Sequence, residues 1–223
     1  MSEWNKSHKT FTLKKIKLLA WFSISYLFLG FFLKMTLVLI EGPGLKKIDE
    51  LILIFIADRL RSSTFTEIAV NITALGSPAF IFFFSILCFI ILFIKKDKMA
   101  ALFLAMNVIG ATSWLLVLKN VIGRERPQVV PRLIEISGLS YPSGHSLVST
   151  ATYLSIAFLF YRRIDSKFLK ILTLGMAGLI IFFIGFSRIY LGVHYPSDVL
   201  SGILFGISLV LWLIALFKSF SIF

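Results

Sequence analysis

The chain has 223 residues, of which 58% are apolar, and a mean hydropathy of +0.92. These values lie outside the range of soluble globular proteins, and several apolar runs are long enough to cross a bilayer, so the sequence predicts an integral membrane protein. The net charge of +12 does not indicate nucleic acid, because the lysines and arginines stand in short clusters at the ends of apolar segments. The single cysteine, Cys88, excludes an intrachain disulfide and a cysteine metal site.

The hydropathy pattern predicts an all-α polytopic protein whose six transmembrane helices form one bundle, with residues 1–223 as a single domain. The first apolar run is too long to be a cleaved signal peptide and lacks a small-residue cleavage site, so we expect it to be retained. The expected spans are about 18–40, 67–94, 99–119, 145–161, 168–187 and 196–217.

Residues 48–60 carry apolar side chains at helical spacing with charged residues between them, but this segment is too short to cross a bilayer. We expect a short amphipathic helix that either lies on the membrane surface or packs on the bundle as an outer loop helix. The next helix is predicted to begin at the capping box formed by Thr64 and Glu67 and to bend at Gly76-Ser77-Pro78.

The distribution of positive charge predicts the orientation. Apart from Lys34 within the first span, thirteen lysines and arginines lie on the side that holds both termini, and nine lie on the opposite side. By the positive-inside rule, both termini are expected in the cytoplasm, and the loops after the third and fifth spans are expected outside.

A polar cluster between the fifth and sixth spans is out of place in a bilayer segment. Gly192 permits a turn and Pro196 suits the first turn of a new helix, so His194 and Asp198 are expected on one helix face. The Asp198 carboxylate can then accept the proton of one imidazole nitrogen and leave the other free to attack. Arg188 adds a permanent cation, and this combination suits a phosphate.

Two further motifs lie at helix ends on the same predicted side. Lys119 and Arg126 follow the third span, where cations serve either as an interfacial anchor or as part of a site. Ser143-Gly144-His145 opens the fourth span, where Ser143 can cap the helix and the free N–H groups of the first turn suit an anion. Because an imidazole at the membrane boundary is costly unless it is used, His145 favours a functional site over ordinary capping.

Together, Lys119-x6-Arg126-Pro127, Pro142-Ser143-Gly144-His145 and Ser187-Arg188-x5-His194-x3-Asp198 resemble the three-part signature of the type 2 phosphatidic acid phosphatase superfamily. This superfamily also includes soluble vanadium haloperoxidases, but six spans argue against that chemistry. The motifs cover residues 119–198, and the six-span layout extends the resemblance over nearly the whole chain. Within the superfamily the chain most resembles the bacterial phosphatidylglycerophosphatase B type, which implies a multi-pass protein of a bacterial plasma membrane. The charge distribution, rather than the resemblance, predicts that its site lies at the outer face.

The resemblance implies that His194 is the nucleophile that forms a phosphohistidine, that Asp198 orients it, and that His145 protonates the leaving oxygen. The residues implied in holding the phosphate are Lys119, Arg126, Ser143, Gly144 and Arg188. No metal or other cofactor is expected, because cations and helix N-terminal amides can stabilise phosphoryl transfer. Three charges, Arg124, Glu125 and Arg132, match no position that can be carried over and are interpreted as interface or rim charges.

The expected activity is hydrolysis of a phosphomonoester on a membrane lipid. The resemblance favours phosphatidylglycerophosphate, with phosphatidylglycerol and phosphate as products, whereas an outward site would also suit undecaprenyl diphosphate. A non-catalytic anion-binding transporter is an alternative of another class, which would need no paired His194 and Asp198. The expected partners are the lipid phosphate and the surrounding membrane lipids, without nucleic acid or an obligate protein partner.

Overall fold

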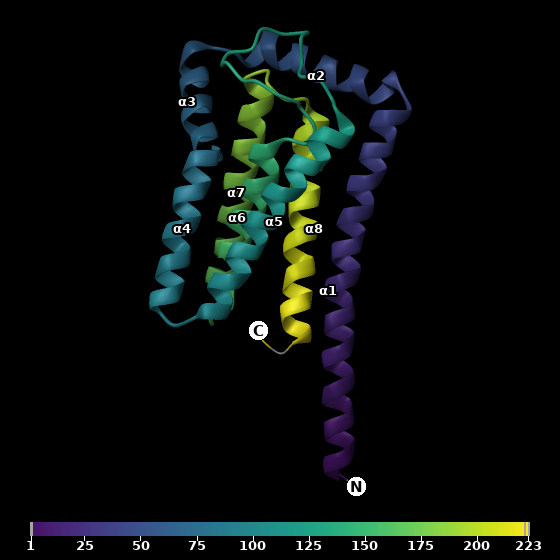
Figure 1. The fold of residues 1–223 in the computed structure, drawn as a ribbon, viewed down its shortest axis with the longest axis vertical. Helices are drawn as coiled ribbons and strands as arrows, with labels where there is room; N and C mark the ends of the chain where they lie inside the picture. Colours follow the sequence, from purple (N-terminus) through teal and green to yellow (C-terminus); the bar gives the residue numbers. More distant parts are fainter. Residues whose placement is uncertain (1, 221, 223) are drawn as a thin grey trace.

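The computed structural model describes residues 2–220 and 222, with side chains for residues 15–220 and 222. In that part of the chain the secondary structure consists of helices without strands, which confirms the all-α class. The helices are α1 (Ser2–Glu41), α2 (Pro43–Leu60), α3 (Ser63–Ala74), α4 (Pro78–Ile94), α5 (Lys98–Ile122), α6 (Gly144–Tyr161), α7 (Lys167–Tyr190) and α8 (Pro196–Ser219). Figure 1 shows α2 lying across one end of a bundle formed by the others, and both chain ends at the opposite end.

The number of spans differs from the prediction. Among the described residues, α1, α5, α7 and α8 contain stretches long and apolar enough to cross a membrane, and α3 with α4 makes a fifth span as a pair bent by 43°. The bend falls at the predicted place, because Ser77 caps α4 and Pro78 is its first residue. The fourth expected span, 145–161, corresponds to α6, which does not qualify because many of its residues are polar. A count of six is therefore not confirmed.

The structure also differs from the prediction at the starts of two helices. The amphipathic segment is longer than residues 48–60, because α2 already begins at Pro43, which suits the first turn of a helix. The predicted capping box at Thr64 is wrong. Ser62 is the N-cap of α3, and its hydroxyl accepts a hydrogen bond from the Phe65 N–H at 3.3 Å, so the helix starts before Thr64.

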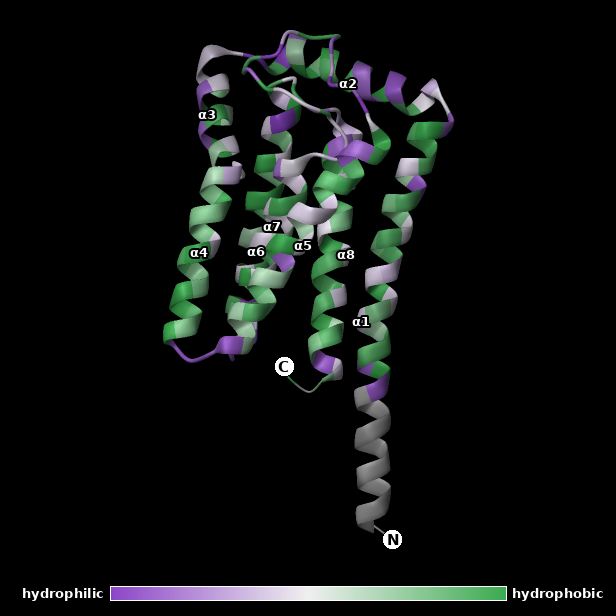
Figure 2. Cartoon of the chain, viewed as in Figure 1, coloured by the Kyte–Doolittle hydropathy of each residue, from purple (hydrophilic) through white to green (hydrophobic). Residues whose placement is uncertain are grey.

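Helix α6 lies inside the bundle, against α5, α7 and α8. Two of its buried hydroxyl groups, those of Thr150 and Thr152, donate to the carbonyls of Ser146 and Val148 at 2.6 and 2.8 Å. Figure 2 shows apolar residues along most of each helix and polar residues gathered at the two ends of the bundle. A helix with as many polar residues as α6 is stable in a membrane when other helices cover it.

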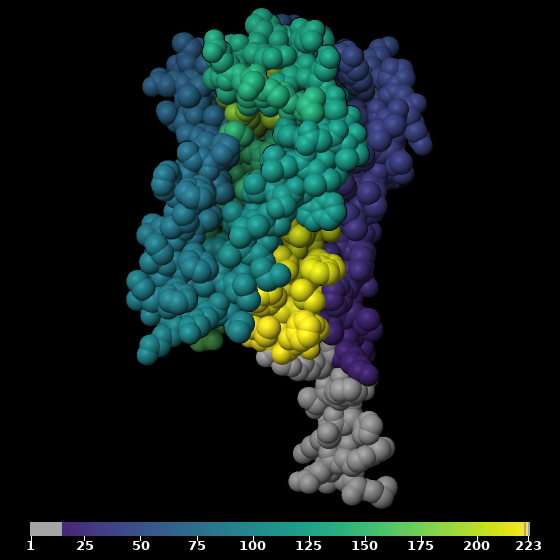
Figure 3. Space-filling model, in the orientation of Figure 1, coloured from purple at the N-terminus to yellow at the C-terminus, as the bar shows by residue number. Residues whose placement is uncertain are grey.

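Glycine residues bring α8 very close to α6. A Cβ atom added at Gly202 would lie 2.8 Å from the carbonyl oxygen of Ser143, so only glycine permits this approach. At the same end the Ser143 N–H donates to the Asp198 carbonyl at 3.0 Å. The packing thus joins the first turns of α6 and α8, which carry two of the three motifs. Figure 3 shows the loop between α5 and α6 covering this end of the bundle.

Candidate active site

The three motifs meet around one cavity at the α2 end of the bundle. The cavity has a volume of about 430 Å³, and five of the eight predicted site residues line it: Lys119, Arg126, Gly144, His145 and His194. The other three, Ser143, Arg188 and Asp198, are buried and do not line it. The structure therefore brings together residues that are separated by up to 75 positions in the sequence.

The imidazole of His194 is held from both sides. On one side, Asp198 Oδ2 lies 3.5 Å from His194 Nδ1, and the hydroxyl of Ser140 lies between these groups. Ser140 Oγ donates to Asp198 Oδ2 at 2.5 Å and lies 3.2 Å from His194 Nδ1. On the other side, Arg126 Nη1 lies 3.1 Å from His194 Nε2.

These contacts determine the tautomer of His194. Arg126 can only donate, so Nε2 must be the accepting nitrogen. Ser140 already gives its proton to Asp198, so its oxygen accepts the proton of Nδ1. The lone pair of Nε2 therefore faces Arg126, and both side chains line the cavity. Burial lowers the pKa of His194 to about 4, although the hydrogen bond and charge of Asp198 act in the opposite direction. The imidazole is thus neutral near pH 7 and able to act as a nucleophile.

The two cations on the α5 side are held by backbone carbonyl groups. Arg126 donates to the carbonyls of Ser137, Gly138 and Val193 at distances of 2.8 to 3.1 Å. Lys119 Nζ donates to the carbonyl of Leu139. Burial lowers the pKa of Arg126, but a guanidinium remains charged under such conditions. Because carbonyl groups orient both cations without neutralising them, their charge remains available to a phosphate.

Arg188 has free hydrogen-bonding capacity in a buried position. Its side chain is 1% exposed, and Nη1 donates to the hydroxyl of Thr73 in α3 at 2.8 Å. Its Nε and Nη2 atoms are buried and have no hydrogen-bond acceptor among the described residues. Leaving donors of a charged group unpaired is costly, so this arrangement suits a residue whose partner is an incoming anion.

The first turn of α6 forms another wall of the cavity. Ser143 caps the helix, because its Oγ accepts from the N–H and the hydroxyl of Ser146 at 3.4 and 3.0 Å. The N–H groups of Gly144 and His145 follow the cap, where helix geometry provides no intrahelical acceptor. Gly144 packs closely on α5, since an added Cβ would lie 2.9 Å from a methyl group of Leu115. The anion site expected here is thus formed by backbone, with the Ser143 hydroxyl engaged in the cap.

The cavity continues from these polar groups along apolar side chains. Its apolar lining includes Ile81 and Phe82 from α4, Val108 and Leu115 from α5, and Val148 from α6. Phe82 is also exposed on the outside of the bundle, so the α4 side of this lining faces the bilayer. A lipid phosphate could therefore bind with its phosphate near the imidazoles and its acyl chains along α4 and α5.

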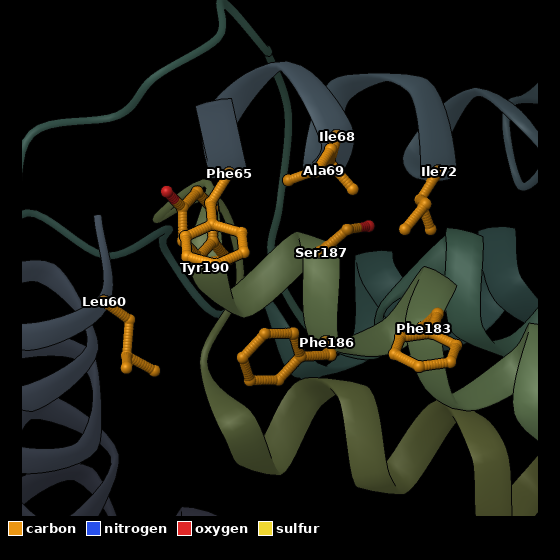
Figure 4. A pocket seen from close by; sticks show the side chains of 9 residues that line it. All are labelled: Leu60, Phe65, Ile68, Ala69, Ile72, Phe183, Phe186, Ser187 and Tyr190. Carbon is orange, nitrogen blue, oxygen red and sulfur yellow. The ribbon is translucent and has the colours of Figure 1, made fainter. Parts of the chain in front are cut away.

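A second cavity, of about 300 Å³, lies between α3 and α7. Figure 4 shows aromatic and aliphatic side chains of both helices facing it, among them Phe65, Ile72 and Phe186. Its lining contains no charged side chain, and its two hydroxyl groups belong to Ser187 and Tyr190. This cavity can hold hydrocarbon but offers nothing to bind a phosphate.

Comparison with known proteins decides the family. The family model described as the PAP2 superfamily matches residues 99–221, a range that contains all three motifs. The chain belongs to the PAP2 superfamily. It is a membrane lipid phosphatase and thus a hydrolase of phosphomonoesters.

Two curated relatives of this PAP2 protein are lipid phosphatases. Phosphatidylglycerophosphatase B of Bacillus subtilis is 34% identical over 154 residues, which are 67% of this chain and 74% of that protein. Lipid A 1-phosphatase of Rhizobium etli is 29% identical over 171 residues, which are 66% of this chain and 68% of that protein.

Two solved structures of bacterial proteins share the fold. The crystal structure of a transmembrane PAP2 type phosphatidylglycerolphosphate phosphatase from Bacillus subtilis matches with a TM-score of 0.81 and 26% identity, over 87% of this chain and 96% of that chain. The crystal structure of Aquifex aeolicus LpxE matches with a TM-score of 0.59 and 23% identity, over 73% of this chain and 92% of that chain, and supports the fold alone.

One interpretation of a charge near the PAP2 site was wrong. Arg124 is not a rim charge, because it donates to Asp198 Oδ1 at 2.5 Å and to Asp49 Oδ2 at 2.8 Å, and its side chain is only 10% exposed. Sequence reasoning also missed Ser140, which stands two residues before the second motif and bridges His194 and Asp198. The one sequence signal for Ser140 was that its polar side chain stands close to the second motif. No sequence pattern pairs Asp49 with a residue 75 positions away.

Proposed function

We propose that this PAP2 phosphatase converts phosphatidylglycerophosphate to phosphatidylglycerol and phosphate, with His194 as the nucleophile. The observation that carries the proposal is a single cavity in which His194, His145 and two cations adjoin apolar walls on α4 and α5. This combination suits a phosphate carried on an acyl lipid. The choice of head group is supported by the similarity to the phosphatidylglycerophosphatase of Bacillus subtilis.

In the first step, His194 Nε2 attacks phosphorus while the ester bond to the leaving oxygen breaks and His145 gives a proton to that oxygen. The positive charge that develops on the ring is stabilised by Asp198 through Nδ1. In the second step, a water molecule loses a proton to His145 and attacks the phosphohistidine, which releases phosphate and restores both imidazoles.

Charge on the equatorial phosphate oxygens is stabilised by cations and backbone amides. Lys119 and Arg126 approach from the α5 side, and Arg188 contributes the two donor atoms that have no acceptor among the described residues. The first turn of α6, capped by Ser143 and lined by Gly144, supplies N–H groups and the positive end of a helix dipole. These groups provide the positive charge that phosphoryl transfer requires, so the proposed reaction proceeds without a metal.

The proposal places six spans in the membrane of a bacterial cell, with α6 as an inner span covered by its neighbours and residues 1–223 as one domain. The excess of lysine and arginine at the end opposite α2 supports cytoplasmic termini and a site at the outer face. With Cys88 replaced, a cysteine at exposed Gln128 should react with an impermeant maleimide in intact cells. A cysteine at exposed Lys95 should react only after permeabilisation, and the reverse pattern would place the site inside.

The test of the function is phosphate release by the purified protein in detergent from a panel of lipid phosphates, in excess chelator. We expect the highest kcat/KM for phosphatidylglycerophosphate, compared with phosphatidic acid, a lipid A 1-phosphate and undecaprenyl diphosphate. A clear preference for undecaprenyl diphosphate would support lipid carrier recycling instead. Activity that chelation removes and Mg²⁺ restores would contradict the metal-free mechanism. A His194→Ala variant is the control for phosphatase contamination.

A further inference from the structure

One buried carboxylate joins α2 to α8. Asp49 is 1% exposed, although α2 lies across the end of the bundle and its next residue, Glu50, is partly exposed. Asp49 Oδ1 accepts from the Ser197 N–H at 2.9 Å, and Oδ2 accepts from the Ser197 hydroxyl. The N-terminus of α8 is therefore capped by a carboxylate from another helix, where a negative charge is favourable.

Arg124 connects this carboxylate to Asp198. Its Nη2 donates to Asp49 Oδ2 at 2.8 Å, and its Nη1 donates to Asp198 Oδ1 at 2.5 Å and to Ser197 Oγ at 2.7 Å. The guanidinium also lies over the ring of Tyr195, with its carbon 3.9 Å from the ring centre. A two-pronged guanidinium fits between two carboxylates in a way that an ammonium cannot.

The charges of this cluster explain why two carboxylates are present. Arg124 alone would neutralise Asp198, and the ring of His194 would then face an ion pair without net charge. With Asp49 included, two carboxylates share one guanidinium, so the cluster of Asp49, Arg124 and Asp198 keeps one net negative charge on the Nδ1 side of His194. Because these groups are buried, their mutual interactions are weakly screened by solvent.

We propose that Asp49 and Arg124 are positioning residues for phosphoryl transfer, which hold Asp198 in place and preserve its negative charge for His194. The helix α2 is then part of the catalytic apparatus through Asp49. This inference rests on the proposed roles of His194 and Asp198 as nucleophile and orienting carboxylate.

The test compares Asp49→Asn with the matched control Glu50→Gln, which removes the neighbouring carboxylate on the same helix. We expect Asp49→Asn to lower kcat by about 10- to 100-fold with KM changed by less than about threefold, because substrate does not touch this cluster. The rate of phosphohistidine formation in a single turnover should fall by the same factor. Glu50→Gln should leave both rates within about twofold of the wild type.

A titration of His194, followed by NMR of ¹⁵N-labelled histidine, distinguishes the positioning role from a purely structural one. Neutralising Asp49 leaves the charge of Arg124 uncompensated, so His194 should titrate at a lower pH than in the wild type. The other charged or titratable groups that act on His194, namely Asp198, Arg126, Arg188 and His145, are unchanged in this variant. A variant that is only less stable would show an unchanged titration.

A second variant keeps the inference testable if Asp49→Asn does not fold. Arg124→Lys retains the buried positive charge but cannot reach both carboxylates, and it should lower kcat by a similar factor. Wild-type kcat in the folded variant would overturn the inference. His194→Ala is measured in the same assay: if it stays active, the proposed function fails, whereas an inactive His194→Ala with an unaffected Asp49→Asn refutes the positioning role alone.

Discussion

The two histidines of the site, His194 and His145, come from similar motifs but are held in different ways. His194 is 1% exposed, with Nδ1 facing Asp198 and Ser140 and Nε2 facing Arg126. His145 is half-buried in the first turn of α6, and none of its ring atoms forms a hydrogen bond with another described residue. A nucleophile must keep one tautomer and one orientation, whereas a general acid must give a proton to the leaving oxygen and later take one from the water that attacks.

We expect His194→Ala to reduce activity the most, because it removes the proposed attacking atom. We expect kcat to fall by about 10⁴-fold or more, as it does when other enzymes lose a nucleophile, while the folded yield stays close to that of the wild type. Phosphate release from the lipid substrate is the measurement. His8→Ala removes the third histidine of the chain and serves as the matched control. Activity above this level in His194→Ala would mean that another group attacks phosphorus.

The second prediction concerns His145→Ala, which removes the proposed acid. With the natural alcohol as leaving group, kcat should fall by about 10² to 10⁴-fold, the usual contribution of general acid catalysis. A substrate with a good leaving group, such as a p-nitrophenyl phosphate ester, needs no protonation, so it should restore much of the lost rate of phosphohistidine formation in His145→Ala. The same substrate should leave His194→Ala inactive. Equal rescue of both variants would show that the two roles are assigned incorrectly.

A smaller loss of activity is expected when one of the contacts at His194 Nδ1 is removed. Ser140→Ala removes the hydroxyl that bridges His194 and Asp198, so the ring loses part of its orientation but keeps the carboxylate 3.5 Å away. We expect kcat to fall by about tenfold with little change in KM, in line with the loss of one buried hydrogen bond. Ser219→Ala, at the far end of α8, should leave kcat unchanged. An unaffected kcat in Ser140→Ala would show that Asp198 alone is sufficient.

The smallest effect is a difference in titration. His194 should lose its proton at a pH of about 4, well below the ordinary histidine value of 6.5, because burial disfavours the charged ring. The active neutral form therefore persists as the pH falls from 7 toward 5, and the acidic limb of kcat/KM lies near pH 4. NMR of ¹⁵N-labelled histidine, assigned with His194→Ala, measures this directly. A midpoint near 6.5 would contradict the buried, doubly held imidazole.

Much of this site could be predicted because its chemistry lies in short motifs at helix ends. Arg126 and His194 follow apolar runs and His145 precedes one, so each charged or titratable side chain stands out. The runs themselves predicted most helix positions to within a few residues. The bend at Gly76 could also be predicted, because glycine and proline have direct effects on the backbone.

The remaining features depend on contacts between distant parts of the chain. Arg124 has the same appearance in the sequence as a surface cation, and only its two buried carboxylate partners show its place beside Asp198. Asp49 belongs to a segment whose amphipathic pattern suits a surface helix equally well. The span expected at 145–161 is too polar to be confirmed by composition, and only the packing of α6 against α5, α7 and α8 shows where its hydroxyl groups are covered.

In the proposed mechanism, Nε2 of His194 becomes bonded to phosphorus. Trapping that bond tests the mechanism most directly. Purified protein is mixed with a lipid substrate labelled in its terminal phosphate, quenched in alkali within one turnover, and digested for peptide mapping. We expect an alkali-stable, acid-labile label on the peptide that contains His194. This label should be present in the wild type and absent in His194→Ala. Label on a peptide without His194, or turnover at the wild-type rate with no trapped label, would contradict it.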